Sequence, residues 1–414
     1  RSFGDNVSVI SKFIDATVRG YEDAGITATI KHFAGRGDSA TDAHDVLDVC
    51  RGDKKRMQDV ELAAFQAGVD AGASALMTAH TIFPAYDEEY PATLSKKILT
   101  DLLRGEMGFD GIIVSDAIGM AAILKKWPLP LACAMAIKAG VDTILLKADD
   151  ESRSQCLFGI KSAVENGTLP EERVNDAVRR LLCRKYDQGL FEKAGKMDPK
   201  ETTRIVRSKE NRDFSWEVAH KALLVVRDDK KLLPLSKDKK ILVIEQTIPY
   251  EFLGKDLYSH AHMFCEQMVK HSTNLILDDA PFHAEEEDIE EALRLAKEAD
   301  LVVMTNYYAR IEKRGNNTHL ARALKAAGHT VVVVTNFPYR KGTTTVADAV
   351  VCNFSGTPDS IRASADLLFG AIKPYPTTKM PIDLSAEQNL PEEPDPAPRK
   401  SQEKKPGNVW GGKC

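Results

Sequence analysis

The sequence predicts an α/β protein with two domains, and three observations support this. Its 414 residues are more than a single domain usually holds. Short runs rich in Val, Ile and Leu alternate with longer segments in which apolar residues recur every three or four positions. This alternation starts twice, near residue 27 and near residue 240. Buried runs separated by helices are typical of a parallel sheet or a barrel.

The expected elements follow this pattern along the chain. Four apolar runs in the first half should form strands, at residues 27–30, 75–78, 112–114 and 143–146. Three segments have helical periodicity, at residues 54–72, 95–109 and 170–191. In the second half, the runs KILVIEQ, DLVVMTNYY, TVVVVTNF and DAVVCNF should be strands of another α/β domain.

Composition narrows the class of protein. A net charge of −5 and the lack of an apolar run of membrane-spanning length argue against nucleic acid and membrane partners. Seven cysteines, without a CxxC pair, favour free thiols and a reducing compartment, so we expect the cytoplasm. The first residue is Arg1 rather than Met, so an extracellular protein that has lost its leader stays open as an alternative. We expect no cofactor and no metal.

Polar side chains follow three of the expected strands. The stretch KHFAGRGDSATDAH, residues 31–44, comes directly after the first strand. His80 and Asp87 follow the second strand, and Ser115 and Asp116 follow the third. The carboxyl ends of parallel strands lie at the same edge of a sheet or barrel, so these side chains should lie close together at that edge.

Each of these residues, taken singly, also has a structural explanation. Asp116 would be the N-cap of the next helix. His80 would be a hydrogen-bonded structural residue at a strand end. Asp42 and His44 would be turn residues in a loop. Their accumulation at the ends of successive strands favours chemistry instead.

The order of several motifs carries a family resemblance. The chain contains, in this order, RSFGDN, IKHFAGRGDSATDAH, MTAHTIFPAYD, PATLS, LLRGEMGFDGIIVSDAIGM and AIKAGVDTILL. With them it resembles family 3 glycoside hydrolases, in the β-N-acetylglucosaminidase (β-hexosaminidase) branch. The resemblance implies retaining hydrolysis that releases terminal β-linked N-acetylglucosamine from glycans or cell-wall fragments, as in peptidoglycan turnover, through a glycosyl-enzyme. The partner it implies is a carbohydrate that contains N-acetylglucosamine.

The same resemblance implies the roles of the site residues. Asp116 would be the nucleophile, His44 the general acid and then base, and Asp42 the group that orients His44. The sugar-binding residues would be Arg1, Lys31, His32 and Met120. A histidine suits proton transfer because its unperturbed pKa of about 6.5 lies near neutrality. Asp42 and His44 can face each other only across a bent backbone, so we expect a mobile loop that delivers the acid/base.

Three residues depart from the family motif. Ala34 stands for a proline, Arg36 for a histidine and Ala43 for a serine. The charge of Arg36 would either favour an anionic substrate or lie in solvent, and we expect solvent.

The resemblance also refines the fold class. Only four expected strands precede the second domain, whereas a (β/α)8 barrel has eight. We therefore expect a partial (β/α)8 TIM-type barrel followed by an α/β sandwich domain. The bounds are 1–190 for the C-terminal part of the catalytic barrel, 191–220 for a connector, 221–384 for the sandwich and 385–414 for a disordered tail. Because an open barrel exposes apolar edges, we expect self-association that covers them.

Two other functions stay open. One is a β-N-acetylglucosaminide phosphorylase, because a histidine acid/base lacks the negative charge that would repel phosphate. The other is an inactive family member that acts as a binding or scaffold protein.

Overall fold

The computed structural model describes residues 3–37, 47–146, 149–193, 198–247, 262–308, 316–338, 342 and 344–381. The chain divides into two compact units, Arg1–Met197 and Asp198–Cys414. The expected domain bounds stay a prediction, and the expected tail at residues 385–414 lies outside the described residues.

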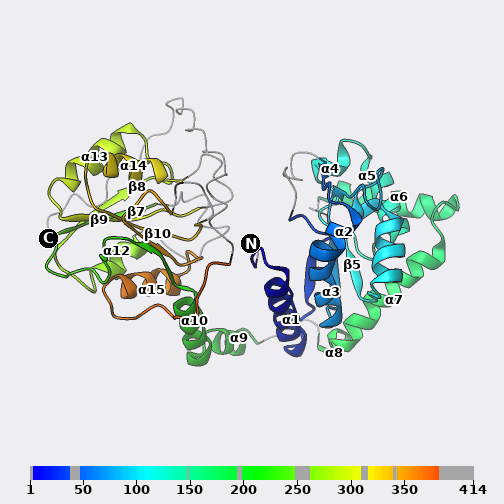
Figure 1. Cartoon of the computed structure of the whole chain (residues 1–414). Helices are drawn as coiled ribbons and strands as arrows, with labels where there is room; N and C mark the ends of the chain where they lie inside the picture. The colour runs from blue at the N-terminus through cyan, green and yellow to red at the C-terminus, as the bar shows by residue number, and fades with distance from the viewer. Residues whose placement is uncertain are drawn as a thin grey trace. The chain divides into compact units, whose positions relative to one another are not determined.

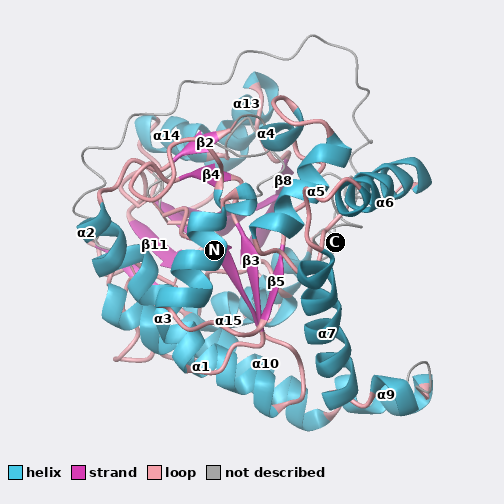
Figure 2. Cartoon of the chain, turned by 90° about the vertical axis from the view of Figure 1, so that its right-hand side faces the viewer, coloured by secondary structure: helices cyan, strands magenta, loops and turns pink. Residues whose placement is uncertain are grey.

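A parallel sheet forms the centre of the first unit. Its strand order is β1 (Thr29–Phe33), β3 (Ala75–Thr78) and β5 (Ile112–Val114). Figure 2 shows β3 and β5 side by side, with α7 (Glu171–Asp187) running near β5. Strands β3 and β5 have the predicted bounds, whereas β1 starts later and extends into the KHF motif.

The prediction of a fourth strand at residues 143–146 is wrong. A single parallel bridge joins Thr143 to Val114. Beyond that bridge, the amide of Leu145 donates to the hydroxyl of Ser115 at 2.9 Å, and its carbonyl accepts from the amide of Ile118 at 3.0 Å. The segment therefore bonds to the loop that follows β5 instead of extending the ladder.

Helices alternate with the strands of this sheet along the chain, and all three predicted helical segments are present. The other elements of the unit are α1 (Val7–Asp23), β2 (Asp48–Val49), α2 (Lys54–Met57), η1 (Gln58–Leu62), α3 (Ala63–Asp70), β4 (Thr81–Ile82), η2 (Ala92–Leu94), η3 (Lys97–Glu106), α4 (Ala121–Leu124), α5 (Leu129–Ala139), α6 (Asp150–Glu165) and α8 (Leu190–Lys193). The short strands β2 and β4 pair in parallel and were not predicted. Helix α3 packs on the sheet through Phe65, whose ring meets that of Phe33 edge to face at 5.2 Å.

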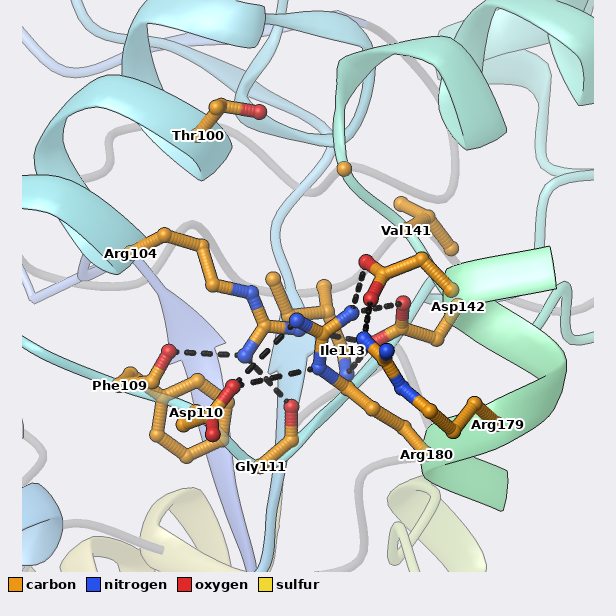
Figure 3. A network of polar contacts seen from close by, with 12 residues as sticks. Thr100, Arg104, Phe109, Asp110, Gly111, Ile113, Val141, Asp142, Arg179 and Arg180 are labelled. Carbon is orange, nitrogen blue, oxygen red and sulfur yellow. Dashed lines mark hydrogen bonds and ion pairs between the residues drawn. The ribbon is translucent and has the colours of Figure 1, made fainter. Parts of the chain in front are cut away.

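One buried carboxylate ties this unit together at the amino ends of its strands. The side chain of Asp142 is 0% exposed, and its Oδ2 accepts from Arg104 at 2.8 Å and from the Ile113 amide at 2.9 Å (Figure 3). Its Oδ1 accepts from Arg173 at 2.6 Å. Since these partners belong to η3, β5 and α7, Asp142 fixes all three to the segment that bridges to β5.

The second unit is built on a six-stranded sheet. Its order is β6-β11-β10-β9-β7-β8, and all neighbours are parallel except β6 and β11. The strands are β6 (Leu224–Asp228), β7 (Ile241–Gln246), β8 (Leu275–Ala280), β9 (Leu301–Thr305), β10 (Val331–Thr335) and β11 (Ala349–Cys352). The four predicted strands are present as β7, β9, β10 and β11, whereas β6 and β8 were not predicted.

Helices cover both faces of this second sheet (Figure 1). They are α10 (Lys209–Ala222), α12 (Met263–Met268), α13 (Glu286–Ala296), α14 (Thr318–Ala326) and α15 (Pro358–Leu368). The unit also contains α9 (Pro199–Val206), none of whose residues is buried. Alternate residues of the strands pack on α12 and α15 and on α13 and α14, which makes two apolar layers. In the described part of the chain, no helix combines the length and the apolar character that crossing a membrane requires.

Candidate active site

Two of the predicted site residues meet at the carboxyl edge of the first sheet. His32 lies in β1 and Asp116 follows β5, with β3 between them. The imidazole Nε2 of His32 lies 3.7 Å from Oδ2 of Asp116, and each side chain is 22% exposed. The pair is therefore accessible from solvent while most of its surface is enclosed by the unit.

The backbone around Asp116 orients its carboxylate. Oδ1 accepts from the amide of Ala117 at 2.8 Å. On the other side, the amide of Ser115 donates to the carbonyl of Thr143 at 2.9 Å, and Ser115 is fully buried. One carboxylate oxygen is thus held by the backbone, while the other faces His32.

Asp116 is not a helix cap, so that structural explanation is wrong. The next helix, α4, has Met120 at its N-cap position and no side-chain cap hydrogen bond. Met120 instead closes a turn, because its amide donates to the carbonyl of Ala117 at 3.0 Å. The half-buried side chain of Met120 belongs to the same segment as Asp116.

His80 and Asp87 follow β3, as predicted, but they are buried. His80 is 1% exposed, with its Nε2 3.0 Å from the carbonyl oxygen of Ala117 and its Nδ1 2.8 Å from Oγ1 of Thr93. Asp87 is 4% exposed and accepts from the hydroxyl of Ser95 at 2.6 Å. The hydrogen-bonded structural explanation is therefore confirmed for His80.

The remaining predicted residues fall into two groups. Lys31 lies in β1 with an exposed side chain. Arg1, Asp42 and His44 lie outside the described residues. Their assigned roles stay predictions.

Arg36 does not lie in solvent, so that expectation is wrong. Its side chain is 25% exposed, and its Nε lies 3.9 Å from Oδ2 of Asp48, whose side chain is 2% exposed. The same Oδ2 lies 3.4 Å from the hydroxyl of Thr81. Arg36 is thus paired with a buried carboxylate that no sequence motif indicates.

The described residues form no metal site. Across the residues that the structure describes, no group of three or more His, Cys, Asp or Glu side chains could hold a metal ion. The chemistry that the described residues offer is a half-buried carboxylate with an imidazole beside it.

Comparisons with known families cover most of the chain. Residues 1–183 match the N-terminal domain of glycosyl hydrolase family 3, and residues 223–409 match the C-terminal domain of the same family.

Curated relatives match part of the chain. A β-hexosaminidase of Stenotrophomonas maltophilia (strain K279a) is 41% identical over 148 residues, which are 35% of this chain and 43% of that protein. β-Hexosaminidase A of Pseudoalteromonas piscicida is 29% identical over 260 residues, which cover 58% of this chain and 43% of that protein. The matches therefore span less than half the length of these relatives.

Solved structures of other proteins are similar to this one over nearly the whole chain. A family 3 β-N-acetylglucosaminidase from Paenibacillus sp. str. FPU-7 has a TM-score of 0.82 and 27% identity, and the match covers 92% of this chain and 72% of that one. A β-glucoside phosphorylase, BglX, has a TM-score of 0.77 and 23% identity, and the match covers 92% of this chain and 69% of that one. This similarity concerns the fold alone. The predicted fold class, a TIM-type domain followed by an α/β sandwich, is confirmed. With both of its domains matched, the chain belongs to glycosyl hydrolase family 3.

Proposed function

We propose that this chain carries the catalytic groups of a retaining β-N-acetylglucosaminidase. The observation that carries the proposal is the half-buried carboxylate of Asp116, with Oδ1 held by the Ala117 amide and Oδ2 facing His32. The names of the sequence relatives, β-hexosaminidases, support the substrate class.

The proposed reaction has two steps. The carboxylate of Asp116 attacks the anomeric carbon, the bond to the leaving oxygen breaks, and His44 gives that oxygen a proton. His44 then takes a proton from water, and the water oxygen displaces Asp116 from the sugar. Asp42 would hold the ring of His44 and stabilise its charged form. Arg1, Lys31, His32 and Met120 would bind the sugar.

The experiment is release of the phenol from an aryl N-acetyl-β-glucosaminide, with the matching aryl β-glucoside as the control substrate. Turnover of the first and slower turnover of the second would support the proposal. Accumulation of a sugar 1-phosphate when phosphate is added would identify a phosphorylase instead. Absence of both turnover and binding of an N-acetylglucosamine analogue would overturn the proposal in favour of a scaffold.

We further propose that the first unit associates with a second copy of the chain. Large apolar side chains are exposed on two helices: Phe13 (53%) and Tyr21 (51%) on α1, and Leu157 (69%) and Phe158 (67%) on α6. Contiguous exposed apolar patches often mark interaction surfaces, and Leu157 and Phe158 are adjacent in the chain. As part of the proposed enzymatic function, we propose that the carbohydrate partner is a glycan with terminal N-acetylglucosamine. Peptidoglycan fragments are the natural substrate that we propose.

We propose the cytoplasm as the location. The described cysteines are all free thiols, which suits a reducing compartment: Cys50, Cys133, Cys156, Cys183, Cys265 and Cys352. Fractionation of cells that produce the protein would test this, and recovery in the extracellular fraction would contradict it.

A further inference from the structure

A second histidine lies beside Asp116 but is closed off from solvent. His80 is 1% exposed, and its two ring nitrogens face the carbonyl of Ala117 and the hydroxyl of Thr93. It is too enclosed to touch a substrate. Its Nε2, however, contacts the residue that follows Asp116 in the chain.

The protons of this cluster have one consistent arrangement. A carbonyl oxygen only accepts, so Nε2 of His80 carries a proton and donates it to Ala117. Burial lowers the pKa of His80, which keeps the ring neutral and makes Nδ1 an acceptor. Nδ1 then accepts from the hydroxyl of Thr93, which lies 2.7 Å from the hydroxyl of Thr78 and accepts from it.

The hydroxyl proton of Thr93 has a second possible acceptor. The hydroxyl of Thr93 also lies 3.0 Å from the carbonyl oxygen of Ala79. That carbonyl already accepts from the backbone amide of Thr93 at 3.2 Å, so it keeps a donor when the hydroxyl turns to His80.

Ala117 connects this hydrogen-bonded chain to the carboxylate of Asp116. The carbonyl of Ala117 accepts from His80 and from the amide of Met120, while its own amide donates to Oδ1 of Asp116. The strand side of Asp116 is fixed by the pairing of Ser115 with Thr143. The other side depends on the turn at residues 116–120. The amide of Ile118 ties this turn to the carbonyl of Leu145, and the buried side chain of His80 holds it at the carbonyl of Ala117.

We propose that His80 is a positioning residue, which fixes the turn at residues 116–120 through the Ala117 carbonyl and thereby aims the carboxylate of Asp116. The inference rests on the proposed role of Asp116 as nucleophile. A displacement of about 1 Å in a reacting group can cost about 100-fold in rate, so a lost hydrogen bond to this turn should have a large effect.

Two amide substitutions separate the contacts of His80. In His80→Gln, the amide nitrogen takes the place of Nε2 and can still donate to Ala117. In His80→Asn, the shorter side chain places its amide group at the position of Nδ1, where the amide oxygen can accept from Thr93, and the donor to Ala117 is lost. Both variants lose the ring, so the pair controls for packing.

The first readout is the kinetics of an aryl N-acetyl-β-glucosaminide. We expect kcat of His80→Asn to fall about 100-fold with KM nearly unchanged, and His80→Gln to stay within about tenfold of the wild type. Equal losses in the two variants, or a normal kcat in His80→Asn, would overturn the inference.

The second readout is hydrogen exchange of the peptide that covers residues 116–120, which does not depend on activity. We expect faster exchange in His80→Asn than in His80→Gln. If the wild-type chain turns over no substrate, the proposed function fails, and this comparison alone decides whether His80 positions the turn. Equal exchange in the two variants would overturn the inference in that case as well.

Discussion

Nε2 of His32 lies 3.7 Å from Oδ2 of Asp116, across the carboxyl edge of a sheet in which their strands are separated by β3. The contact brings together the strand end of the KHF motif and the strand end of the VSD motif. Because Oδ1 is bound to the Ala117 amide, Oδ2 is the oxygen that the described contacts leave directed toward the imidazole. The two contacts fix the orientation of a half-buried carboxylate at this edge.

Asp142 should be essential for the stability of the first unit. Its replacement by alanine leaves Arg104, 16% exposed, without its carboxylate partner, and leaves Arg173, 18% exposed, with Asp176 alone. Removing one partner of a buried ion pair costs about 3–5 kcal/mol. Urea unfolding followed by tryptophan fluorescence measures the loss, with Trp216 and Trp410 replaced by phenylalanine so that Trp127, which lies in this unit, is the reporter.

Asp110→Ala is the matched control for Asp142. The carboxylate of Asp110 also meets an arginine of this network, Arg180 at 3.3 Å, but its side chain is 92% exposed (Figure 3). An exposed pair contributes about 0–1 kcal/mol, so this variant should unfold close to the wild type. Equal destabilisation by the two substitutions would contradict the role assigned to Asp142.

The second unit should lose stability in acid through Asp348. Burial alone would raise the pKa of this carboxyl, but Lys325, the amide of Val331 and Lys230 lower it to about 2 from its ordinary value of 3.8. The unfolded chain therefore takes up the proton first as the pH falls. The stabilisation is complete above pH 3.8 and is lost as the pH falls through about 2, and it amounts to about 2 kcal/mol.

Acid unfolding of Asp348→Asn provides the comparison. The variant lacks the titrating group, so its stability should change less between pH 4 and pH 2 than that of the wild type. Parallel pH profiles for the two proteins would show that Asp348 does not supply the dependence.

His44→Ala should show a dependence on the leaving group. A proton donor matters most when the departing oxygen is basic, so a disaccharide should lose more rate in the glycosylation step than an aryl glycoside with an acidic phenol. The measurement is pre-steady-state release from both substrates. Equal losses would indicate that His44 has a structural role.

Charges on α6 should weaken self-association. Leu157→Lys combined with Phe158→Lys places two cations on the exposed apolar face of α6. We expect light scattering to report a smaller particle than for the wild type. Lys161→Ala, on the same helix, is the control, and an unchanged mass of the double variant would argue against this surface.

Much of the fold follows from apolar runs. Strands β3 and β5 are short and mostly buried, with Ser74 before the first and Ser115 after the second, so their bounds could be read from the sequence. Strand β8 could not, because its sequence LILDDA places two acidic residues in a strand of which three side chains are half-buried and two are exposed. The run at residues 143–146 resembles a strand, but bonds between Leu145 and the loop after β5 take the place of a ladder.

The site was predictable in its residue types and less so in its contacts. The position of Asp116 after a buried strand pointed to the carboxyl edge. That His80 would be buried, and would bond the residue after Asp116, depends on how the loops after β3 and β5 fold together. The ion pair of Arg36 likewise depends on Asp48, whose burial could not be predicted from the neighbouring sequence.

Trapping of the glycosyl-enzyme tests the central claim most directly. A fluorinated N-acetylglucosaminyl fluoride slows the second step, so the covalent intermediate accumulates and its peptide can be identified by mass spectrometry. We predict one sugar adduct on Asp116, the same adduct in an Asp110→Asn control, and none in Asp116→Asn. Turnover without an adduct, or an adduct on another residue, would contradict the assignment of Asp116 as the nucleophile.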